Sequence, residues 1–542
     1  MKEKDSFILD IKRLGINGEG IGFYNRMAVF VPNAIPGEGH LITVEKVDGK
    51  MAFGKTEEIK HPSSYRVVPS CPYYDECGGC NTSHIEYKEM LKFKKEAITE
   101  ALNRYTKINY RQFEIKPTVE SDKIFGYRNR SQLAVRKDMN FKYTTTMLKE
   151  KSNQAININE CMVQDPNINR INNEILKLAD ELEIPPYVAK YNRGGLRYLV
   201  TRVNQKGEAL VCIICAEKNS KVKELAKRAI NITGVKSVYE SFNNSKKENT
   251  FFGDEINHLE GDAYIIETIG NIKYRIYPNT FFQLNTAQAK KMYDLVLKAC
   301  KLSRKERVLD AYCGVGTIGL YLAHMAKEVV GIEYNKDAVI AANENAKINK
   351  IKNSTFLQGD AKELLPKMLK EGQEFDILVV DPPRVGLGEE FINTIIEAKI
   401  PRLVYASCNP ATLAKDLEVL SKIYQIKYIT PLDMFPQTAH VETITLLQRK
   451  DIDDRLKVRF DLDNVPLVKE ETKSTYQEIK DYIFNKYYVK FSTLNIAQTK
   501  TKYGIIEREC YNKPKDDDSR QPKCTREKEE MIVDALKHFK ML

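Results

Sequence analysis

The pattern of hydrophobic and polar residues changes along the chain and indicates different folds in different segments. Up to residue 60, short apolar runs separated by Gly, Asn and Pro turns predict about five β-strands, which is typical of a small β-barrel. Residues 305–450 contain apolar runs such as VLDAY, VVGIEY and RLVYASC that alternate with helical stretches. This alternation predicts a parallel sheet with helices on both faces, so the expected fold class is α/β.

The segments between and after these two regions have patterns of their own. Residues 61–280 combine a helix with apolar positions at helical spacing, strand-like runs and a hairpin in RYLVTRVNQKGEALVCIICAE, and we expect a central α+β domain there. Residues 451–542 form a basic extension. In it, YQEIKDYIFNKYYVKFSTLNIAQTKTKYGI predicts two helices around a short break, as in helix-turn-helix units, KPKDDDSRQPK predicts a loop, and TREKEEMIVDALKHF predicts a final helix. Four domains are expected, over residues 1–60, 61–280, 281–450 and 451–542.

Composition and charge narrow the class of protein. The 542 residues are 42% hydrophobic, which is enough for ordinary cores, and no run of roughly 18 apolar residues predicts a transmembrane helix. The N-terminus MKEKDSFILDIKRLG lacks the apolar centre of a secretory signal, so we expect a cytoplasmic protein. Lys and Arg outnumber Asp and Glu by 85 to 74, and the net charge of +11 favours a polyanionic partner such as nucleic acid.

One group of cysteines has the spacing of a metal site. The stretch CPYYDECGGC brings Cys71, Cys77 and Cys80 together, because its two glycines let the backbone bend tightly. Cys161, in NINECMVQ, is the natural fourth ligand. Four thiolates suit either zinc or an iron–sulfur cluster, and a lone distant cysteine favours a [4Fe-4S] cluster. We expect a structural role for it, because nothing nearby suggests an electron acceptor. Zinc remains the alternative.

A second motif predicts a nucleotide-type cofactor. ERVLDAYCGVGTIGLYLA is a strand, a glycine-rich turn and a helix, in which Gly314 lets a ligand approach closely, and the next strand ends at Glu333, which can bind ribose hydroxyls. A dinucleotide-binding fold shares these features. Asp310 at the start of the turn, and Asp381 in ILVVDPPRVG, instead resemble S-adenosylmethionine-dependent methyltransferases. The stiff Asp-Pro-Pro turn would hold a carboxylate beside a planar substrate.

A third motif places a thiol at the end of a strand. LVYASCNPATLAKDL runs through apolar positions to Cys408 and then breaks at Asn409 and Pro410. Such a cysteine is either a small core residue or a nucleophile at the rim of a sheet. Cys212 and Cys215, by contrast, face opposite sides of an apolar strand, so we interpret both as core residues.

In combination these motifs resemble the family of RNA uridine-5 methyltransferases, which includes 23S rRNA enzymes and their tRNA relatives. The resemblance covers roughly residues 1–450 and includes GEGIG followed by FVPNAIPGE, which looks like a TRAM domain, together with CPYYDECGGC, FFQLN, DAYCGVGTIGL, DPPRVGL, YASCNPATLAKDL and HVETITLLQRK. It implies an RNA-binding TRAM barrel, a Rossmann-like methyltransferase domain over residues 281–450, S-adenosyl-L-methionine as methyl donor and a [4Fe-4S] cluster.

The resemblance also implies roles for individual residues. Cys408 matches the nucleophile of the family, and Glu442 matches its base. The ligands of the iron–sulfur cluster match Cys71, Cys77, Cys80 and Cys161. The residues expected to bind the cofactor or line its pocket are Gln283, Tyr312, Gly314, Glu333 and Asp381.

The chemistry of uracil explains why such an enzyme needs a thiol. Uracil C5 is a poor nucleophile, but attack by a thiolate at C6 lets C5 accept a methyl group from a sulfonium. A carboxylate near C5 then removes the C5 proton, and the thiolate leaves. The expected reaction therefore passes through a covalent adduct between Cys408 and C6.

A uridine in folded RNA must be splayed out to enter such a pocket. In FGYRNRSQLAVR, Arg128 and Arg130 face one side of a strand-like segment, and we predict phosphate or base contacts for both. Phe281, in FFQLN, either stacks on a base or packs in the core. The TRAM-like barrel and the cluster favour 23S rRNA over tRNA, and we expect a monomer. The basic extension either adds RNA affinity or has no partner.

Two other functions are compatible with parts of the sequence. An RNA or DNA amino-methyltransferase also carries a DPP-type turn but needs no cysteine nucleophile. A non-catalytic RNA-binding factor would need only the barrel and a basic surface. The combination of Cys408, Glu442 and the glycine-rich turn favours the uridine-5 methyltransferase over both.

Overall fold

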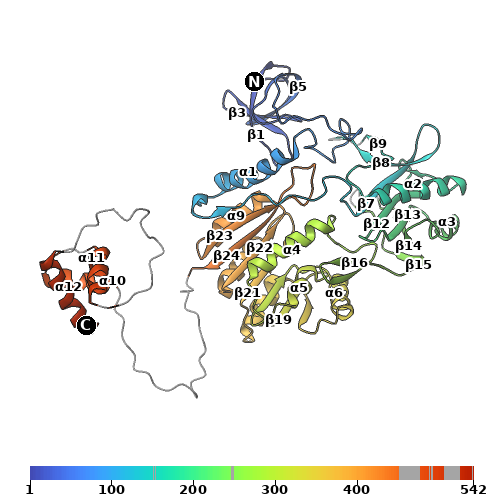
Figure 1. Ribbon diagram of the computed structural model, residues 1–542. Coiled ribbons are helices and arrows are strands. Elements are labelled where there is room, and N and C mark those ends of the chain that lie inside the picture. Colours follow the sequence, from blue (N-terminus) through green and yellow to red (C-terminus); the bar gives the residue numbers. More distant parts are fainter. Residues whose placement is uncertain are drawn as a thin grey trace. The chain divides into compact units, whose positions relative to one another are not determined.

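The structure of the protein, a computed structural model, describes residues 1–149, 152, 154–245, 250–450, 476–487, 489, 492–503, 505, 525–539 and 541–542. The chain divides into two units, residues 1–454 and 455–542, each with its own set of contacts (Figure 1). Among the helices of this described part, none is long and apolar enough to cross a membrane.

The first unit begins with a closed barrel of five strands, which confirms the small β-barrel predicted for residues 1–60. Alternate residues point into the barrel, where Leu9, Ile11 and Val29 are buried. Gly22 is required where two strands approach closely, because a Cβ atom there would lie 2.5 Å from the Asp10 carbonyl oxygen. The identification of this barrel as a TRAM domain stays a prediction. The strands are β1 (Ser6–Leu14), β2 (Gly20–Tyr24), β3 (Met27–Val31), β4 (Gly39–Asp48) and β5 (Met51–His61).

A seven-stranded sheet follows, with the order β15-β14-β13-β12-β7-β8-β9. The predicted hairpin is present, since β12 and β13 are antiparallel and turn at Gly207. Cys212 and Cys215 are buried in β13, which confirms them as core residues, and α2 and α3 pack on the sheet. The elements are β7 (Arg130–Lys137), β8 (Tyr143–Leu148), β9 (Ala155–Asn157), α2 (Pro166–Glu181), β12 (Leu196–Val203), β13 (Ala209–Cys215), α3 (Lys221–Ala229), β14 (Val235–Phe242) and β15 (Ile256–Gly261).

Two small antiparallel pairs lie outside the two large sheets, one before β12 in the chain and one after β15. They are β10 (Tyr187–Val188) with β11 (Arg193–Gly194), and β16 (Ile265–Ile269) with β17 (Ile272–Ile276). The second pair leads directly into the loop before α4 (Thr286–Cys300). This loop contains the FFQLN motif and therefore joins the two large sheets of the unit.

The largest sheet has eight strands in the order β20-β19-β18-β21-β22-β24-β23-β6. Its first five strands in this order are parallel, as predicted for residues 305–450. Helices α4, α5 and α6 pack on one face, and α7, α8 and α9 on the other. The elements are β18 (Arg307–Ala311), α5 (Thr317–Ala323), β19 (Glu328–Glu333), α6 (Lys336–Ile348), β20 (Ser354–Gln358), α7 (Ala361–Lys370), β21 (Ile377–Val380), α8 (Glu389–Ala398), β22 (Arg402–Ser407) and α9 (Pro410–Leu420).

The parallel prediction is wrong for β24, the strand formed by ETITLLQ, whereas β23 runs in the same direction as β22. β23 (Tyr424–Leu432) and β24 (Glu442–Arg449) are antiparallel to each other, and β24 is antiparallel to β22. The segment between them, residues 433–441, contains no helix and is too short for the crossover that a parallel pair requires. The chain therefore turns back, and β24 begins at the edge of the sheet where β22 ends.

Part of the chain that precedes the central sheet packs on the C-terminal one. α1 (Tyr87–Tyr105) lies against α9, where Ile98 and Leu102 join the same core as Leu413 and Leu417. The short strand β6 (Glu114–Ile115) pairs in parallel with β23. The division of the chain into four domains at residues 60, 280 and 450 stays a proposal.

The described residues of the second unit form three helices with a core of their own. α10 (Tyr476–Tyr487), α11 (Thr493–Lys502) and α12 (Arg526–His538) match the helices predicted for the extension. Ile483, Ile496 and Leu536 are buried in this core. A helix-turn-helix function stays a prediction. The predicted loop KPKDDDSRQPK lies outside the described residues.

Candidate active site

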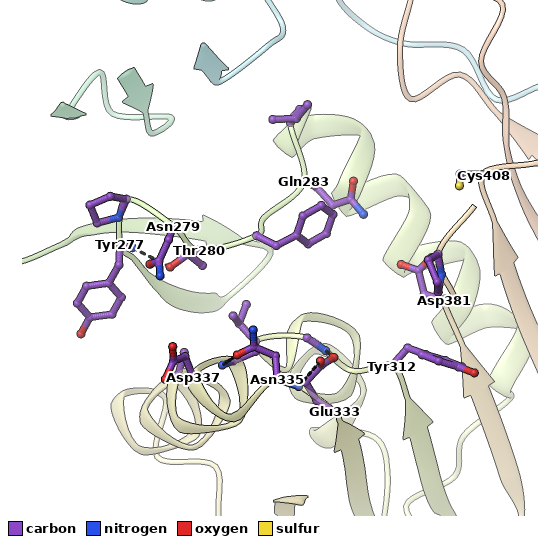
Figure 2. Close-up of a pocket in the computed structure, with 18 of the residues that line it drawn as sticks. Tyr277, Asn279, Thr280, Gln283, Tyr312, Glu333, Asn335, Asp337, Asp381 and Cys408 are labelled. Atoms are coloured by element: carbon purple, nitrogen blue, oxygen red, sulfur yellow. Dashed lines mark hydrogen bonds between the residues drawn. The ribbon is translucent and has the colours of Figure 1, made fainter. Parts of the chain in front are cut away.

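A cavity of about 1230 Å³ lies at the carboxyl ends of the parallel strands, where ligands bind in open α/β sheets. In Figure 2, Glu333 and Asn335 lie on one side of it, Gln283 lies on the opposite side, and Cys408 and Asp381 lie together at one end. The cavity therefore brings together four segments that are far apart in the sequence. Every cofactor-pocket residue expected from the sequence lines it: Gln283, Tyr312, Gly314, Glu333 and Asp381.

The glycine-rich turn between β18 and α5 forms the floor of the cavity. Gly314 and Gly316 have φ values of 54° and 79°, which glycine adopts without strain. A Cβ atom on Gly314 would meet no atom within 4 Å, so any larger side chain would project into the cavity. Asp310 accepts a hydrogen bond of 2.8 Å from the Gly319 N–H, and burial raises the pKa of its carboxyl to about 8. The turn is thus fixed from beneath and leaves room for a ligand.

Glu333, at the end of β19, is held by two backbone groups. Its carboxylate accepts the Gly314 N–H at 3.1 Å and the Asn335 N–H at 2.8 Å (Figure 2). Asn335 in turn caps α6 by accepting the Ala338 N–H. These contacts fix an acidic side chain beside the open glycine turn, which is the arrangement that binds ribose hydroxyls in nucleotide-binding sheets. The residues present fit an adenosine-containing cofactor.

The FFQLN loop covers the cavity from the other side. Phe281 is 72% exposed and lines the cavity, whereas Phe282 is buried in the core, so Phe281 does not pack in the core. Asn129 fixes the loop, because its side chain donates to the Gln283 carbonyl at 2.9 Å and to the Thr286 hydroxyl at 2.9 Å. Apart from its place between two arginines, no pattern in the sequence indicated Asn129.

The two arginines predicted to contact RNA lie in different surroundings. Arg128 is exposed and lines the cavity. Arg130 is only partly exposed, and its guanidinium donates to the Pro278 carbonyl at 3.2 Å, beneath the same loop. Of the two arginines predicted to face one side, only Arg128 therefore lines the cavity. Contact of either residue with RNA stays a prediction.

Cys408 and Glu442 occupy adjacent strand ends. β22 and β24 are antiparallel with Ser407 opposite Thr443, and the Thr443 hydroxyl donates to the Ser407 carbonyl at 3.0 Å. Cys408 follows β22 directly, and Glu442 is the first residue of β24. This register brings the thiol and the carboxyl to the same end of neighbouring strands, and both line the cavity.

The charged groups around Cys408 influence one another. Burial and the neighbouring Glu442 raise the pKa of the Cys408 thiol to about 11, while Arg384 acts in the opposite direction. Burial and Asp381 raise the pKa of Glu442 to about 8, and Arg384 and Lys94 lower it. Burial also raises the pKa of Asp381 to about 7. Arg384 is thus a cation that favours the ionised forms of both Cys408 and Glu442.

Asn409 links the Cys408 turn to the DPPRVG loop. Its side-chain oxygen caps α9 by accepting the Ala411 N–H at 3.1 Å, and its amide group donates to the Arg384 carbonyl at 3.0 Å. The Arg384 guanidinium donates to Nδ1 of His440 at 3.2 Å, so the other ring nitrogen of neutral His440 carries the proton. The Asn-Pro dipeptide after Cys408 is a sequence signal for this cap, but nothing in the sequence indicated its bond to Arg384.

The four cysteines of the first cluster come together in space. Burial and the other three cysteines raise the pKa of Cys80 to about 12, and among the three cysteines Cys161 has the largest effect. Among the described residues, however, no group of three or more Cys, His, Asp or Glu side chains is arranged to hold a metal ion. The donor set has the chemistry of a metal site, but its side chains are not in a ligating arrangement.

Comparisons with known proteins agree with this site. Residues 86–450 match the model of the tRNA (uracil-5-)-methyltransferase family. An uncharacterized RNA methyltransferase of Bacillus anthracis is 39% identical over 449 residues, covering 82% of this chain and 97% of that protein. Another, of Enterococcus faecalis, is 39% identical over 453 residues, covering 83% of this chain and 99% of that protein.

A solved structure is similar over the same part of the chain. The tRNA (uracil-54, C5)-methyltransferase of Pyrococcus abyssi, in complex with S-adenosyl-L-homocysteine, is 31% identical with a TM-score of 0.65. The similarity covers 81% of this chain and 100% of that one. The family match ends at residue 450, so the second unit lies outside it.

Proposed function

The chain belongs to the tRNA (uracil-5-)-methyltransferase family, and we propose that it methylates C5 of a uridine in 23S rRNA through a covalent bond between Cys408 and C6 of the ring. As a member of this family it is an S-adenosylmethionine-dependent RNA (uracil-5-)-methyltransferase, which rules out the amino-methyltransferase and the non-catalytic RNA-binding factor. The covalent mechanism is supported by the placement of Cys408 and Glu442 on adjacent strand ends that face one cavity.

The reaction begins at Cys408. Its thiolate adds to C6 of the uracil ring, and the electron pair of the C5–C6 double bond moves toward C5 and the C4 carbonyl. Arg384 assists because its positive charge favours the thiolate over the thiol. The turn Cys408-Asn409-Pro410 is held by the cap on α9, so the sulfur points into the cavity from a fixed backbone.

The second half of the reaction depends on Glu442. S-adenosylmethionine, when bound, supplies a methyl group on a sulfonium that the activated C5 accepts. Glu442 then removes the C5 proton, the double bond between C5 and C6 re-forms, and the bond from C6 to the Cys408 sulfur breaks. The pKa of about 8 makes Glu442 a stronger base than an ordinary glutamate once it is ionised.

The cofactor site is the part of the cavity around the glycine-rich turn. We propose that Glu333 binds the ribose hydroxyls and that Gly314 leaves space for the methionine part. Tyr312, Gln283 and Asp381 would line the same space. The Pyrococcus abyssi enzyme was solved with S-adenosyl-L-homocysteine, which supports a site of this kind in the shared fold.

RNA would approach from the side that carries Arg128 and Phe281. Both line the cavity and are exposed, so Arg128 can bind a phosphate and Phe281 can stack on a splayed base. The partly buried Arg130 would act mainly by holding the loop that presents Phe281. The barrel would bind RNA farther from the target uridine.

The choice between 23S rRNA and tRNA rests on different observations. The barrel and the four-cysteine group resemble the 23S rRNA enzymes, and this favours 23S rRNA. The 31% identical Pyrococcus abyssi protein is a tRNA (uracil-54, C5)-methyltransferase, and this makes a tRNA uridine the second candidate.

The four cysteines would hold a [4Fe-4S] cluster with a structural role. The proposal is supported by four thiols that lie near one another and by their spacing in the chain. Chemical analysis for iron and labile sulfide after anaerobic purification tests it. Zinc without sulfide would assign a zinc site instead. If both iron and zinc were absent, the proposal of a metal site would be wrong.

The experiment that tests the proposed function compares two purified RNA pools. 23S rRNA and tRNA are isolated from cells that lack the gene and incubated separately with the enzyme and S-adenosylmethionine. Mass spectrometry of the digested RNA should find new 5-methyluridine in the 23S rRNA. New 5-methyluridine only in tRNA would transfer the proposal to tRNA, and its absence from both would overturn it.

A further inference from the structure

The loop that leads into Glu442, residues 433–441, is fixed at two separate places. Its first part is held by the helices of the sheet: Lys94 forms a buried ion pair with Asp433, the Tyr87 hydroxyl donates to the same carboxylate at 2.8 Å, and Gln288 donates to the Asp433 carbonyl at 2.7 Å. These contacts fix where the loop begins.

The last part of this loop is held by the segment that follows Cys80. The Ala439 N–H donates to the side-chain oxygen of Asn81 at 3.0 Å, and the Thr82 N–H donates to the Gln437 carbonyl at 3.2 Å. Ala439 lies three positions before Glu442. The segment after Cys80 therefore determines the backbone immediately before the proposed base.

The same two residues touch the barrel. The side-chain amide of Asn81 donates to the Asn17 carbonyl in the turn between β1 and β2. A Cβ atom on the neighbouring Gly18 would lie 3.0 Å from the Thr82 side chain and 3.2 Å from that of Asn81, so the turn is packed directly on both. One amide side chain thus binds the barrel with its nitrogen and the Glu442 loop with its oxygen.

We propose that Asn81 is a positioning residue that couples the placement of the barrel on RNA to the placement of Glu442. This inference rests on the proposed function, in which the barrel binds RNA and Glu442 removes the C5 proton. Asparagine suits the task because its amide carries a donor and an acceptor on one rigid group. Movement of the β1–β2 turn is passed to Ala439 through this group, in addition to the apolar cluster in which Ala439 packs near Ile35 of the barrel.

The coupling acts on one step of the reaction. Cys408 is positioned by the end of β22 and the cap of α9, whereas the position of Glu442 depends on the loop that Asn81 binds. A misplacement of about 1 Å in a catalytic group costs about a hundredfold in rate. Loss of the Asn81 contacts should therefore slow proton removal much more than formation of the covalent adduct.

Two RNA probes separate these steps, and both are total RNA from cells that lack the gene. In RNA that contains 5-fluorouridine, no C5 proton can be removed, so the adduct with Cys408 persists and its rate of appearance reports attack and methyl transfer. In RNA that contains [5-³H]uridine, the release of tritium reports proton removal. The full-length enzyme is used throughout, and its metal content is measured for every variant.

Three variants separate the contacts. Asn81→Ala removes both hydrogen bonds of the side chain. Asn81→Asp keeps an acceptor for the Ala439 N–H but loses the donor to the Asn17 carbonyl. Tyr74→Phe is the control, because it removes a different contact between this segment and the barrel, the hydrogen bond from Tyr74 to the Asn33 side chain.

The expected result is a change in one rate and not in the other. Asn81→Ala and Asn81→Asp should release tritium about tenfold or more slowly than the wild type, with adduct formation on 5-fluorouridine RNA within about twofold of it, and Tyr74→Phe should change neither rate. An unchanged Asn81→Ala variant, an equal fall of both rates, or a wild-type rate for Asn81→Asp would overturn the coupling. Absence of the adduct in the wild type would instead overturn the proposed function.

Discussion

Lys94 of α1 and Asp433 of the loop between β23 and β24 form an ion pair in which both side chains are fully buried. The Asp433 carboxylate also accepts the Tyr87 hydroxyl, and Lys94 donates to the Phe435 carbonyl at 3.3 Å. The pair joins a helix that precedes the central sheet to the loop that leads into Glu442. It therefore fixes the start of this loop against the catalytic sheet.

Removal of one partner of this pair should destabilise the enzyme strongly. Lys94→Met leaves the Asp433 carboxylate buried without its cation, at a cost of about 3–5 kcal/mol in the free energy of unfolding. Urea denaturation monitored by circular dichroism measures this cost. The double variant Lys94→Met/Asp433→Asn should recover much of it, because it leaves no buried charge. A double variant as unstable as the single one would contradict the assignment to the ion pair.

Cys408→Ala should abolish methyl transfer without affecting cofactor binding. The substitution removes the nucleophile, so we expect 5-methyluridine formation to fall by about 10³-fold or more and no adduct with 5-fluorouridine RNA. Mass spectrometry and denaturing gels measure the two effects. Calorimetric titration with S-adenosylhomocysteine is the control and should give the wild-type affinity. Retained methylation would rule out the covalent mechanism.

Arg384→Gln should make Cys408 less reactive before any RNA is bound. Because Arg384 favours the thiolate, its loss raises the pKa of the Cys408 thiol further above its ordinary value. Alkylation of Cys408 by iodoacetamide at pH 8, followed by peptide mass spectrometry, should become several-fold slower. Arg384→Lys keeps the positive charge and serves as the matched control. An unchanged rate in Arg384→Gln would show that its charge does not act on Cys408.

The raised pKa values of the site predict a particular pH dependence of stability. Burial, helped by Asp381, raises the pKa of Glu442 from 4.5 to about 8, so the folded protein holds a proton that the unfolded chain loses between these two values. The free energy of unfolding should therefore fall as the pH rises from about 5 to 8. Glu442→Gln carries no such proton. Its free energy of unfolding, taken relative to that of the wild type, should therefore be higher at pH 8 than at pH 5 by on the order of 2 kcal/mol.

Thermal or urea unfolding at both pH values measures this difference. Glu333→Gln is a suitable control, since it removes a carboxyl from the same cavity but leaves Glu442 in place. Equal effects of Glu442→Gln at pH 5 and pH 8 would contradict a proton held by Glu442 in the folded enzyme.

Glu333→Ala should weaken binding of the cofactor more than it weakens the fold. Its carboxylate is the acidic group beside the glycine turn, and its loss removes the proposed ribose contact. Calorimetry should show an affinity for S-adenosylhomocysteine lower by about tenfold or more. At a saturating concentration of cofactor, the variant should still form the adduct between Cys408 and 5-fluorouridine RNA. Wild-type affinity would place the ribose elsewhere in the cavity.

Local patterns in the sequence were enough to predict the main elements. Turn residues at short intervals indicated the barrel, and alternating apolar runs and helices indicated the parallel part of the catalytic sheet. The glycine-rich turn and Glu333 could be assigned to one pocket because carboxyl ends of parallel strands always lie at the same edge. Gly314 and Glu333 could be assigned to the pocket from this pattern, Asp381 was assigned to it through the family resemblance, and all three line the cavity.

Other parts of the site could not be read in this way. Phe281 and Phe282 are adjacent and chemically identical, and only packing shows that Phe282 is buried while Phe281 faces the cavity. Arg128 and Arg130 have the same spacing as any pair on one strand face, yet a carbonyl on a distant loop binds Arg130 and holds it beneath that loop. In each case the outcome depends on a partner far away in the chain.

Which residue types are available for the chemistry follows from the amino-acid sequence alone: a thiol at a strand end, a glycine-rich turn and acidic residues after apolar strands. Tertiary contacts, in contrast, set β24 antiparallel to β22 with Ser407 opposite Thr443, and this brings Glu442 beside Cys408. Strand direction and register depend on hydrogen bonds between segments distant in sequence, because the local alternation of residues is the same for either direction.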